Sequence, residues 1–174
     1  MKKIETKKVK TKKVRTKIEN NTKNIFFYTF NKIVVGIAAD ENSIVGLDFG
    51  RTVPDGFTRA ETPLIQKAAE QIKEYFAGKR KKFSLPIVMR GTEFQMDVWR
   101  ALQSIPYGET RSYKDIAAQI GRPKAVRAVG MANHRNPISI IVPCHRVIGH
   151  NGSLTGYGGG LPLKQYLLEL ERGK

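Results

Sequence analysis

The chain has 174 residues, with 31 Lys or Arg against 15 Asp or Glu, which gives a formal net charge of +16. This length suits one domain or two small ones, and a hydrophobic content of 40% is enough to form a buried core. No apolar run approaches the roughly 20 residues that span a bilayer, and the charged N-terminus lacks the apolar region of a secretory signal. The single cysteine excludes an internal disulfide, so we expect a cytoplasmic protein, and the positive charge favours a polyanionic partner.

Residues 1–24 are the most basic segment, with ten Lys or Arg against two Glu. We expect a solvated, disordered arm that attracts polyanions without reading their sequence. The spacing of its Val and Ile residues leaves a strand as the alternative. Charge alone does not separate nucleic acid from an anionic membrane, although the segment lacks the pattern of an amphipathic membrane helix.

Residues 25–88 have the pattern of a small α/β domain. Three segments, 25–30 (IFFYTF), 32–39 (KIVVGIAA) and 44–50 (IVGLDFG), are rich in β-branched and aromatic residues and are separated by Asn, Asp and Gly. They predict an antiparallel meander. Residues 80–88 are expected to be a further strand or the linker to the next part.

A helix is predicted between the meander and this linker. Thr62 is suited to cap its N-terminus, with Pro63 at the first helical position. Residues 64–76 carry apolar side chains at helical spacing, and Gly78 follows as a stop signal.

Residues 89–174 form the second predicted domain, which consists mostly of short helices. Thr92 and Gln95 form a capping-box pattern before the periodic segment 93–105, which ends at the turn residues PYGE (106–109).

Two more helices are predicted in close succession. Ser112 and Asp115 are suited to cap YKDIAAQI, which Gly121 ends, and Pro123 opens KAVRAVGMANH. Two short helices joined by GRP in a basic chain have the form of a helix-turn-helix motif, with a plain αα-hairpin as the alternative.

Three further segments complete the chain. ISIIV (138–142) is predicted to be a buried strand that leads to Cys144. NGSLTGYGGG (151–160) is predicted to be a loop or the wing of a winged helix, and LPLKQYLLELE (161–171) the closing helix.

Cys144 lies in the segment IVPCHRVIG, before His145 and Arg146. A thiol is a nucleophile only as thiolate, so a cationic or hydrogen-bonding environment would have to lower its pKa. His145 is a candidate base if the turn after Pro143 brings the two side chains together, and Glu171 is a candidate to orient the imidazole. The alternative is a small buried hydrophobe. One Cys and three His show no metal-ligand spacing, so we expect no metal site.

Residues 92–171 resemble the O6-alkylguanine-DNA alkyltransferases, which are also called methylated-DNA–protein-cysteine methyltransferases. The resemblance rests on the motifs SY, PKAVRAVG, NP, PCHRV and GYGGGL, in this order and at matching spacing. The N-terminal part is similar only loosely.

This resemblance implies an α+β fold, with a small N-terminal α/β domain of ribonuclease-H-like shape and a C-terminal winged-helix DNA-binding domain. It also implies direct DNA repair by a monomer without a cofactor or an obligate protein partner. The protein would bind double-stranded DNA that contains O6-alkylguanine, flip the base through the minor groove and transfer the alkyl group irreversibly and stoichiometrically to Cys144. We expect O4-alkylthymine as a further substrate.

The resemblance also implies catalytic roles. Cys144 matches the alkyl acceptor, His145 the water-assisted base and Glu171 the carboxylate that orients this base. Tyr113 matches the tyrosine that donates a proton to N3 of the leaving guanine. Asn136 matches the asparagine that fixes the turn before the active site.

Contacts to the substrate base are implied in the same way. The carbonyls of Cys144 and Val147 match the acceptors for the exocyclic amine of guanine. Tyr157 and Gly158 match the segment that closes over the base.

The helix that follows Pro123 matches the one that enters the minor groove in this family, a groove too narrow for ordinary recognition helices. Arg127 matches the residue that is inserted into the base stack. We expect a face of small residues on this helix, formed by Ala125, Ala128, Gly130 and Ala132, and basic DNA contacts from Arg122 and Lys124.

The chain departs from the family pattern at three points. Gly158 stands where many members have serine, so a side-chain hydrogen bond to O6 is absent. Ser139 stands where mammalian members have a second proline, which predicts poorer binding of O6-benzyl substrates. The N-terminal domain has no Cys and no His, which excludes the zinc site that some members carry there.

Three other functions remain as alternatives. A homologue that recognises lesions without repairing them would lack Cys144. A winged-helix regulator with an inert thiol would need none of Tyr113, Asn136, His145 and Glu171. A cysteine hydrolase would need room for the water that resolves its covalent intermediate, and would turn over.

Overall fold

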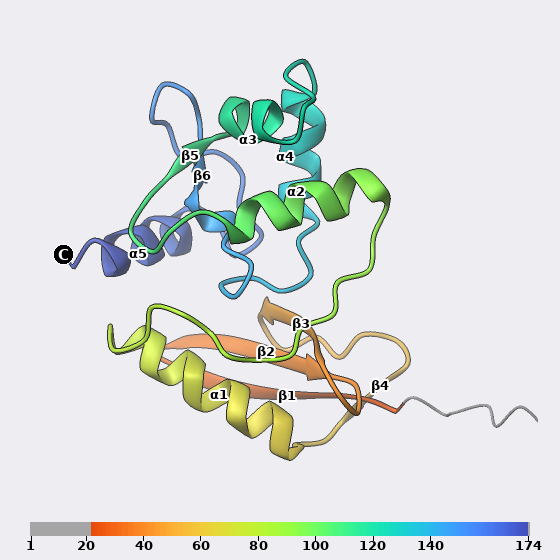
Figure 1. Ribbon diagram of the computed structural model, residues 1–174. Helices are drawn as coiled ribbons and strands as arrows, with labels where there is room; N and C mark the ends of the chain where they lie inside the picture. The colour runs from red at the N-terminus through yellow and green to blue at the C-terminus, as the bar shows by residue number, and fades with distance from the viewer. Residues whose placement is uncertain (1–21, 174) are drawn as a thin grey trace, which may run out of the picture.

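The computed structural model describes residues 22–173, and Figure 1 shows a sheet with one helix below and a group of helices above. Residues 1–21, which hold most of the predicted basic arm, lie outside the described residues. The first strand, β1 (Lys23–Phe30), begins two residues before the predicted boundary at residue 25.

The sheet has four strands. β1 pairs antiparallel with β2 (Ile33–Ala39), and β2 pairs antiparallel with β3 (Ile44–Phe49), which confirms the predicted meander. A fourth strand, β4 (Phe57–Arg59), pairs parallel with β1 and was not predicted, because three residues are too few to show a period. The strand order is β3-β2-β1-β4.

Helix α1 (Pro63–Phe76) packs on this sheet. The side chain of Thr62 accepts a hydrogen bond from the amide of Ile65, and Gly78 follows the helix with φ +71°, as the stop signal predicted. Seven residues of α1 are buried, so the helix and the sheet enclose a hydrophobic core between them.

Residues 77–92 link the two parts, and their middle covers the free edge of β3. The amide of Ile44 donates to the carbonyl of Pro86 at 2.8 Å, and the amide of Val88 donates to the carbonyl of Ile44 at 3.0 Å. Of the two possibilities for residues 80–88, the linker is confirmed, with one isolated bridge between Ile44 and Ile87 instead of a strand.

The upper part contains four α-helices, one short 3-10 helix and a pair of two-residue strands within the described residues. The helices are α2 (Glu93–Gln103), α3 (Tyr113–Gln119), α4 (Val126–His134) and α5 (Leu161–Glu171), and the strands are β5 (Arg111–Ser112) and β6 (Val147–Ile148). Both predicted capping boxes are present, Thr92 with Gln95 and Ser112 with Asp115.

Helix α4 begins at Val126, although the sequence predicted a start directly after Pro123. The amide of Ala125 donates to the carbonyl of Arg122 at 2.9 Å and closes a turn around Pro123 and Lys124. This turn delays the helix by two residues and separates α4 from α3.

The prediction of a strand at residues 138–142 is wrong. Only Ile138 forms a bridge, to Leu47 of β3, and Ile140 has φ +70° in the left-handed region. The amide of Val142 donates to the carbonyl of Ile138 at 2.9 Å, which closes a turn. A short buried apolar run has no period that separates a strand from such a turn.

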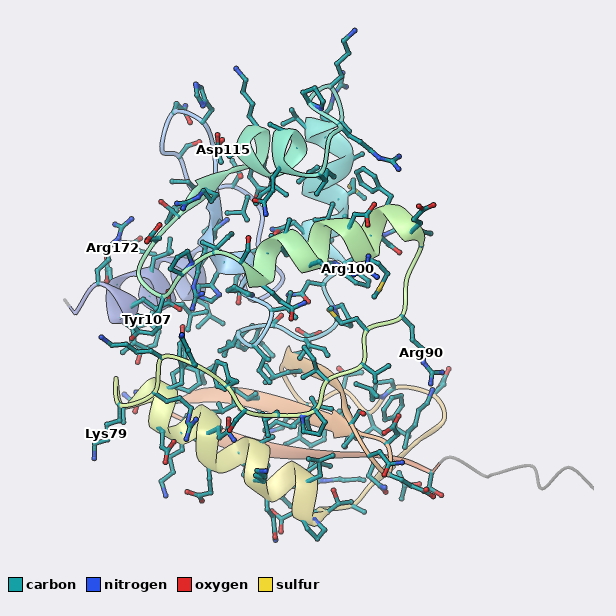
Figure 2. All side chains as sticks on the ribbon, viewed as in Figure 1. Lys79, Arg90, Arg100, Tyr107, Asp115 and Arg172 are labelled. Carbon is teal, nitrogen blue, oxygen red and sulfur yellow. The ribbon has the colours of Figure 1, made fainter. Side chains whose placement is uncertain are left out.

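The two parts meet along β3. The amide of Leu47 donates to the carbonyl of Pro137, and the amide of Ser139 donates back to the carbonyl of Leu47, both at 2.9 Å. Figure 2 shows that side chains fill the space between the ribbons, with Tyr107 at the end of this space near α5. The turn that precedes Cys144 is therefore held by the sheet of the other part.

Candidate active site

Cys144 lines a cavity of about 300 Å³ that lies between the two parts, a volume at the lower end of small-molecule sites. It begins the short 3-10 helix η1 (Cys144–Arg146), and its side chain is 4% exposed. The upper part supplies Asn133, His134, Asn136, Ser139, Gly156, Tyr157 and Gly158 to the wall, and β3 supplies Asp48 and Phe49.

The cavity favours a neutral thiol. Burial raises the pKa of Cys144 and outweighs the opposing effects of hydrogen bonding to Asn136 and Ser139 and of the charge on Lys164. The expectation that the surroundings lower this pKa is therefore wrong. A reaction at sulfur requires a base that accepts the thiol proton.

The neighbouring residue, His145, has the properties of such a base. Its side chain is completely buried, and burial lowers its pKa despite the hydrogen bond to Glu171, so the imidazole is neutral at pH 7. Nε2 lies 2.7 Å from Oε1 of Glu171, which fixes the proton on Nε2. Nδ1 is buried without a hydrogen-bond partner among the described residues and is free to accept a proton.

The carboxylate of Glu171 is held from several sides. Nε and Nη2 of Arg146 donate to its two oxygens at 2.8 and 3.0 Å, the amide of Gly108 donates at 3.1 Å and the hydroxyl of Tyr75 at 2.7 Å. Burial raises the pKa of Glu171, but hydrogen bonds from His145 and Arg146 outweigh burial and hold it well below its ordinary range. Glu171 is therefore ionised and rigid.

Asn136 stabilises the turn between α4 and Cys144. Its Nδ2 donates to the carbonyl of Val142 at 2.7 Å, and its Oδ1 accepts from the amide of Ile138 at 3.1 Å. One side chain thus spans the turn that contains Ile140, and this position agrees with the role that the resemblance implied.

Tyr113 is the first residue of α3 and lies between α4 and the glycine-rich loop. Its hydroxyl accepts a hydrogen bond from Thr155 at 3.2 Å, and its ring lies next to Gly130 of α4. Burial raises the pKa of Tyr113 above 10, and the charge of a Cys144 thiolate acts in the same direction. The phenol is therefore protonated and can donate.

Tyr157 and Gly158 lie in the loop between β6 and α5 and line the cavity. The ring of Tyr157 packs against Phe49 of β3, with centroids 5.9 Å apart. A Cβ atom at Gly158 would meet nothing within 4 Å, so the serine of other family members would fit here.

The carbonyls that were predicted to receive the base are already engaged. Nζ of Lys164, which is 0% exposed, donates to the carbonyl of Val147 at 2.6 Å, and Nδ2 of Asn133 donates to the carbonyl of Cys144 at 3.3 Å. Each carbonyl has a second lone pair for the base. Burial lowers the pKa of Lys164 to about 8.

The outer face of α4 is exposed, and basic residues gather at and before its N-terminal end. Arg127 and Ala128 are exposed on the helix, and Arg122 and Lys124 are exposed in the turn before it. Arg122 lies over the ring of Phe94, 5.5 Å from its centroid.

The predicted face of small residues is only partly correct. Gly130 is half-buried beside Tyr113, because positions 128 and 130 lie on opposite sides of a helix of 3.6 residues per turn. Ala132 is buried near the end of the helix, where its carbonyl accepts a hydrogen bond from Nε1 of Trp99. Met131, which the sequence did not single out, is 56% exposed beside Ala128.

Comparisons with known proteins agree with this site. The family model "6-O-methylguanine DNA methyltransferase, DNA binding domain" matches residues 93–173, and "6-O-methylguanine DNA methyltransferase, ribonuclease-like domain" matches residues 28–89. A methylated-DNA–protein-cysteine methyltransferase of Methanosarcina acetivorans is 52% identical over 140 residues, which are 78% of this chain and 89% of that protein. The chain belongs to the methylated-DNA–protein-cysteine methyltransferase family.

Other members of the methyltransferase family cover a similar share of the chain. The constitutive enzyme of Bacillus subtilis is 51% identical over 158 residues, which are 84% of this chain and 95% of that protein. The crystal structure of Mycobacterium tuberculosis OGT in complex with DNA aligns with a TM-score of 0.81 at 46% identity, over 86% of this chain and 93% of that chain. These matches confirm the predicted fold, a ribonuclease-like domain followed by a DNA-binding domain.

Sequence reasoning located the centre of the methyltransferase site and missed its surroundings. Arg146 was noted only as a neighbour, and Tyr75 and Lys164 were not noted at all, although all three hold groups next to Cys144. The position of Lys164 between Leu163 and Leu167 in the predicted closing helix was the one available signal.

Two absences hold for residues 22–173, the part of the chain that the structure describes. None of the helices is both long and apolar enough to span a membrane. No group of three or more His, Cys, Asp or Glu side chains is arranged to hold a metal ion.

Proposed function

We propose that this protein repairs DNA directly by transferring the alkyl group of O6-alkylguanine to its own Cys144. The observation that carries this proposal is the placement of the only cysteine in a cavity next to a neutral His145 whose Nε2 is bound to Glu171. Relatives over most of the chain are methylated-DNA–protein-cysteine methyltransferases, which supports the same reaction.

The reaction follows from the charges of the site. The thiol proton passes through a water molecule to Nδ1 of His145, and Glu171 stabilises the resulting imidazolium. The thiolate attacks the alkyl carbon in line, so that an S–C bond forms as the C–O6 bond breaks. Tyr113 donates a proton to N3 of guanine, which leaves as a neutral base, and no cofactor takes part.

The product is a thioether on Cys144, which the site has no means to cleave. One molecule therefore repairs one lesion, and the protein is consumed. O4-alkylthymine carries the alkyl group on an equivalent oxygen and is proposed as a second substrate.

The target carbon is inaccessible inside the base stack, so the nucleotide has to be flipped into the cavity. We propose that α4 enters the minor groove, with Arg127 in the gap left by the base and Arg122 and Lys124 on phosphates. A crystal structure of the Mycobacterium tuberculosis homologue in complex with DNA supports this partner. Binding is expected to depend on salt and to be nearly independent of sequence.

The mass of the intact protein tests the proposal. After mixing with an excess of duplex that contains one O6-methylguanine, the protein should gain one CH₂ on the Cys144 peptide, in a 1:1 ratio to repaired guanine. Cys144→Ser should bind the duplex and gain no mass. Tight binding by the wild type without a mass change would favour a protein that recognises lesions only, and multiple turnovers would favour a hydrolase.

A further inference from the structure

One hydrogen bond to Glu171 comes from the other part of the molecule. His145, Arg146 and Gly108, which donate to this carboxylate, all belong to the part that contains Cys144. Tyr75 is on α1, 96 positions away in the sequence, and its hydroxyl donates to Oε1 at 2.7 Å. The carboxylate that orients the base is thus completed by the ribonuclease-like domain.

The position of Tyr75 is fixed by packing. Its side chain is 0% exposed, and its ring contacts Phe83 and Tyr107 with centroids 5.7 and 6.2 Å away. Burial and the charge of Glu171 raise the pKa of Tyr75 well above 10, so its hydroxyl is always a donor. The hydroxyl also lies 3.4 Å from Nε2 of His145.

Tyr75 and His145 share one acceptor atom, Oε1 of Glu171. A donor on that oxygen draws electron density from it and limits how strongly the carboxylate stabilises a protonated imidazole. It also stops the carboxylate from rotating away from Nε2. These two effects give Tyr75 control over the base without contact with the substrate.

We propose that Tyr75 is a positioning residue for alkyl transfer, which holds Glu171 and sets the basicity of His145 from the ribonuclease-like domain. This inference rests on the proposed function. Through Tyr75 the ribonuclease-like domain takes part in the reaction, although this domain contributes none of the reacting atoms.

Other charged groups near this network have to stay constant in any test. The charges that act on His145 or Tyr75 come from Arg146 on η1, Lys164 and Glu171 on α5, and Tyr157 in the loop before α5. Tyr107, which follows α2, packs against the ring of Tyr75, and Nζ of Lys81 lies 5.6 Å from the Tyr107 ring centroid. A substitution at Tyr75 that preserves its ring leaves all of them in place.

Tyr75→Phe is the main test, in single-turnover reactions with saturating O6-methylguanine duplex from pH 5 to pH 9. We expect the rate at pH 7 to fall about 5-fold, because the carboxylate without this hydrogen bond turns away from Nε2 of His145, and the loss of orientation outweighs the gain in basicity. We expect the acid limb of the pH profile to move up by about 0.5 unit, because Glu171 then stabilises the imidazolium more strongly.

The matched control is Tyr28→Phe. Tyr28 is in the same domain and also donates to a carboxylate, that of Glu61, but neither residue lines the cavity that contains Cys144. This variant should lose stability without any change in the pH profile. If Tyr28→Phe moves the profile as Tyr75→Phe does, the effect comes from general destabilisation and the proposal is wrong.

A second variant tests the same inference even if Tyr75→Phe does not fold. A fluorinated tyrosine at position 75 has a more acidic hydroxyl and donates a stronger hydrogen bond, so the acid limb should move down. Identical profiles for tyrosine, fluorotyrosine and phenylalanine would overturn the inference while wild-type transfer stands. A wild type that gains no mass would instead refute the proposed function.

Discussion

The two domains of this protein differ in how they contribute to one site. The C-terminal domain contains Cys144, the proposed base His145 and helix α4 within about 80 residues of sequence. The ribonuclease-like domain contributes no reacting atom, but it contributes Tyr75 to the carboxylate, Phe49 to the cavity and Leu47 to the turn before the cysteine. The difference teaches that the chemistry is encoded locally, whereas its geometry depends on contacts across the whole chain.

Glu171→Gln should have the largest effect, because it breaks the centre of the C-terminal network. The buried Arg146 would lose its counter-charge, which costs about 3 kcal/mol of unfolding free energy, and transfer should become much slower because the imidazolium is no longer stabilised. Urea unfolding measures the loss of unfolding free energy, and single-turnover kinetics measure the rate of transfer. Glu70→Gln, at an exposed ion pair of α1 with Lys73, is the control and should leave both unchanged.

The same network predicts how stability depends on pH. The pKa values of His145 and Glu171 are both lower in the folded protein than their ordinary values of 6.5 and 4.5. Each group therefore stabilises the folded protein at pH values above its ordinary pKa. This stabilisation is lost as the pH falls from the ordinary pKa towards the lower pKa of the folded state. The stability gap between wild type and Glu171→Gln should shrink between pH 5 and pH 3. A gap that stays constant over this range would show that the charge of Glu171 does not stabilise the fold.

Ser139→Pro tests the contact between the domains and has an intermediate effect. Proline removes the amide that donates to Leu47, so unfolding free energy should fall by about 1–3 kcal/mol, while the flat ring should speed inactivation by O6-benzylguanine. Ser139→Ala keeps the amide and should match the wild type in stability. Equal inactivation rates for wild type and Ser139→Pro would contradict the predicted role of position 139.

Removal of residues 1–20, which lie outside the described residues, should have the smallest effect on transfer. The segment holds nine Lys or Arg and two Glu, so its loss should weaken DNA binding and reduce the dependence of binding on salt. Transfer at saturating DNA should be unchanged. A slower transfer step under these conditions would mean that the segment has a structural role.

The sequence predicted those features that depend on neighbouring residues. The capping boxes at Thr92 and Ser112 and the stop at Gly78 are local hydrogen-bonding patterns, and the structure has all three. The turn at Ile140 was predicted as a strand because a short apolar run fits both. Residues 92–171 could be assigned to a family because their motifs follow one another closely in the chain, and the family model matches residues 93–173.

The rest of the site could not be predicted because it depends on tertiary packing. Nothing near Tyr75 in the sequence indicates that its hydroxyl meets a carboxylate from the last helix. The pKa of Cys144 was predicted in the wrong direction for the same reason. A nucleophilic thiol was expected to need surroundings that lower its pKa, whereas burial in the folded protein raises it.

In the proposed reaction the thiol of Cys144 is neutral until His145 takes its proton. Because Cys144 is the only cysteine, labelling of its Cβ with ¹³C gives a single NMR signal whose chemical shift reports the ionisation of sulfur. A titration of the DNA-free protein should place the pKa of Cys144 above its ordinary value of 9.0. A pKa below 7 would mean that the sulfur is already ionised at rest, and the role given to His145 and Glu171 would be wrong.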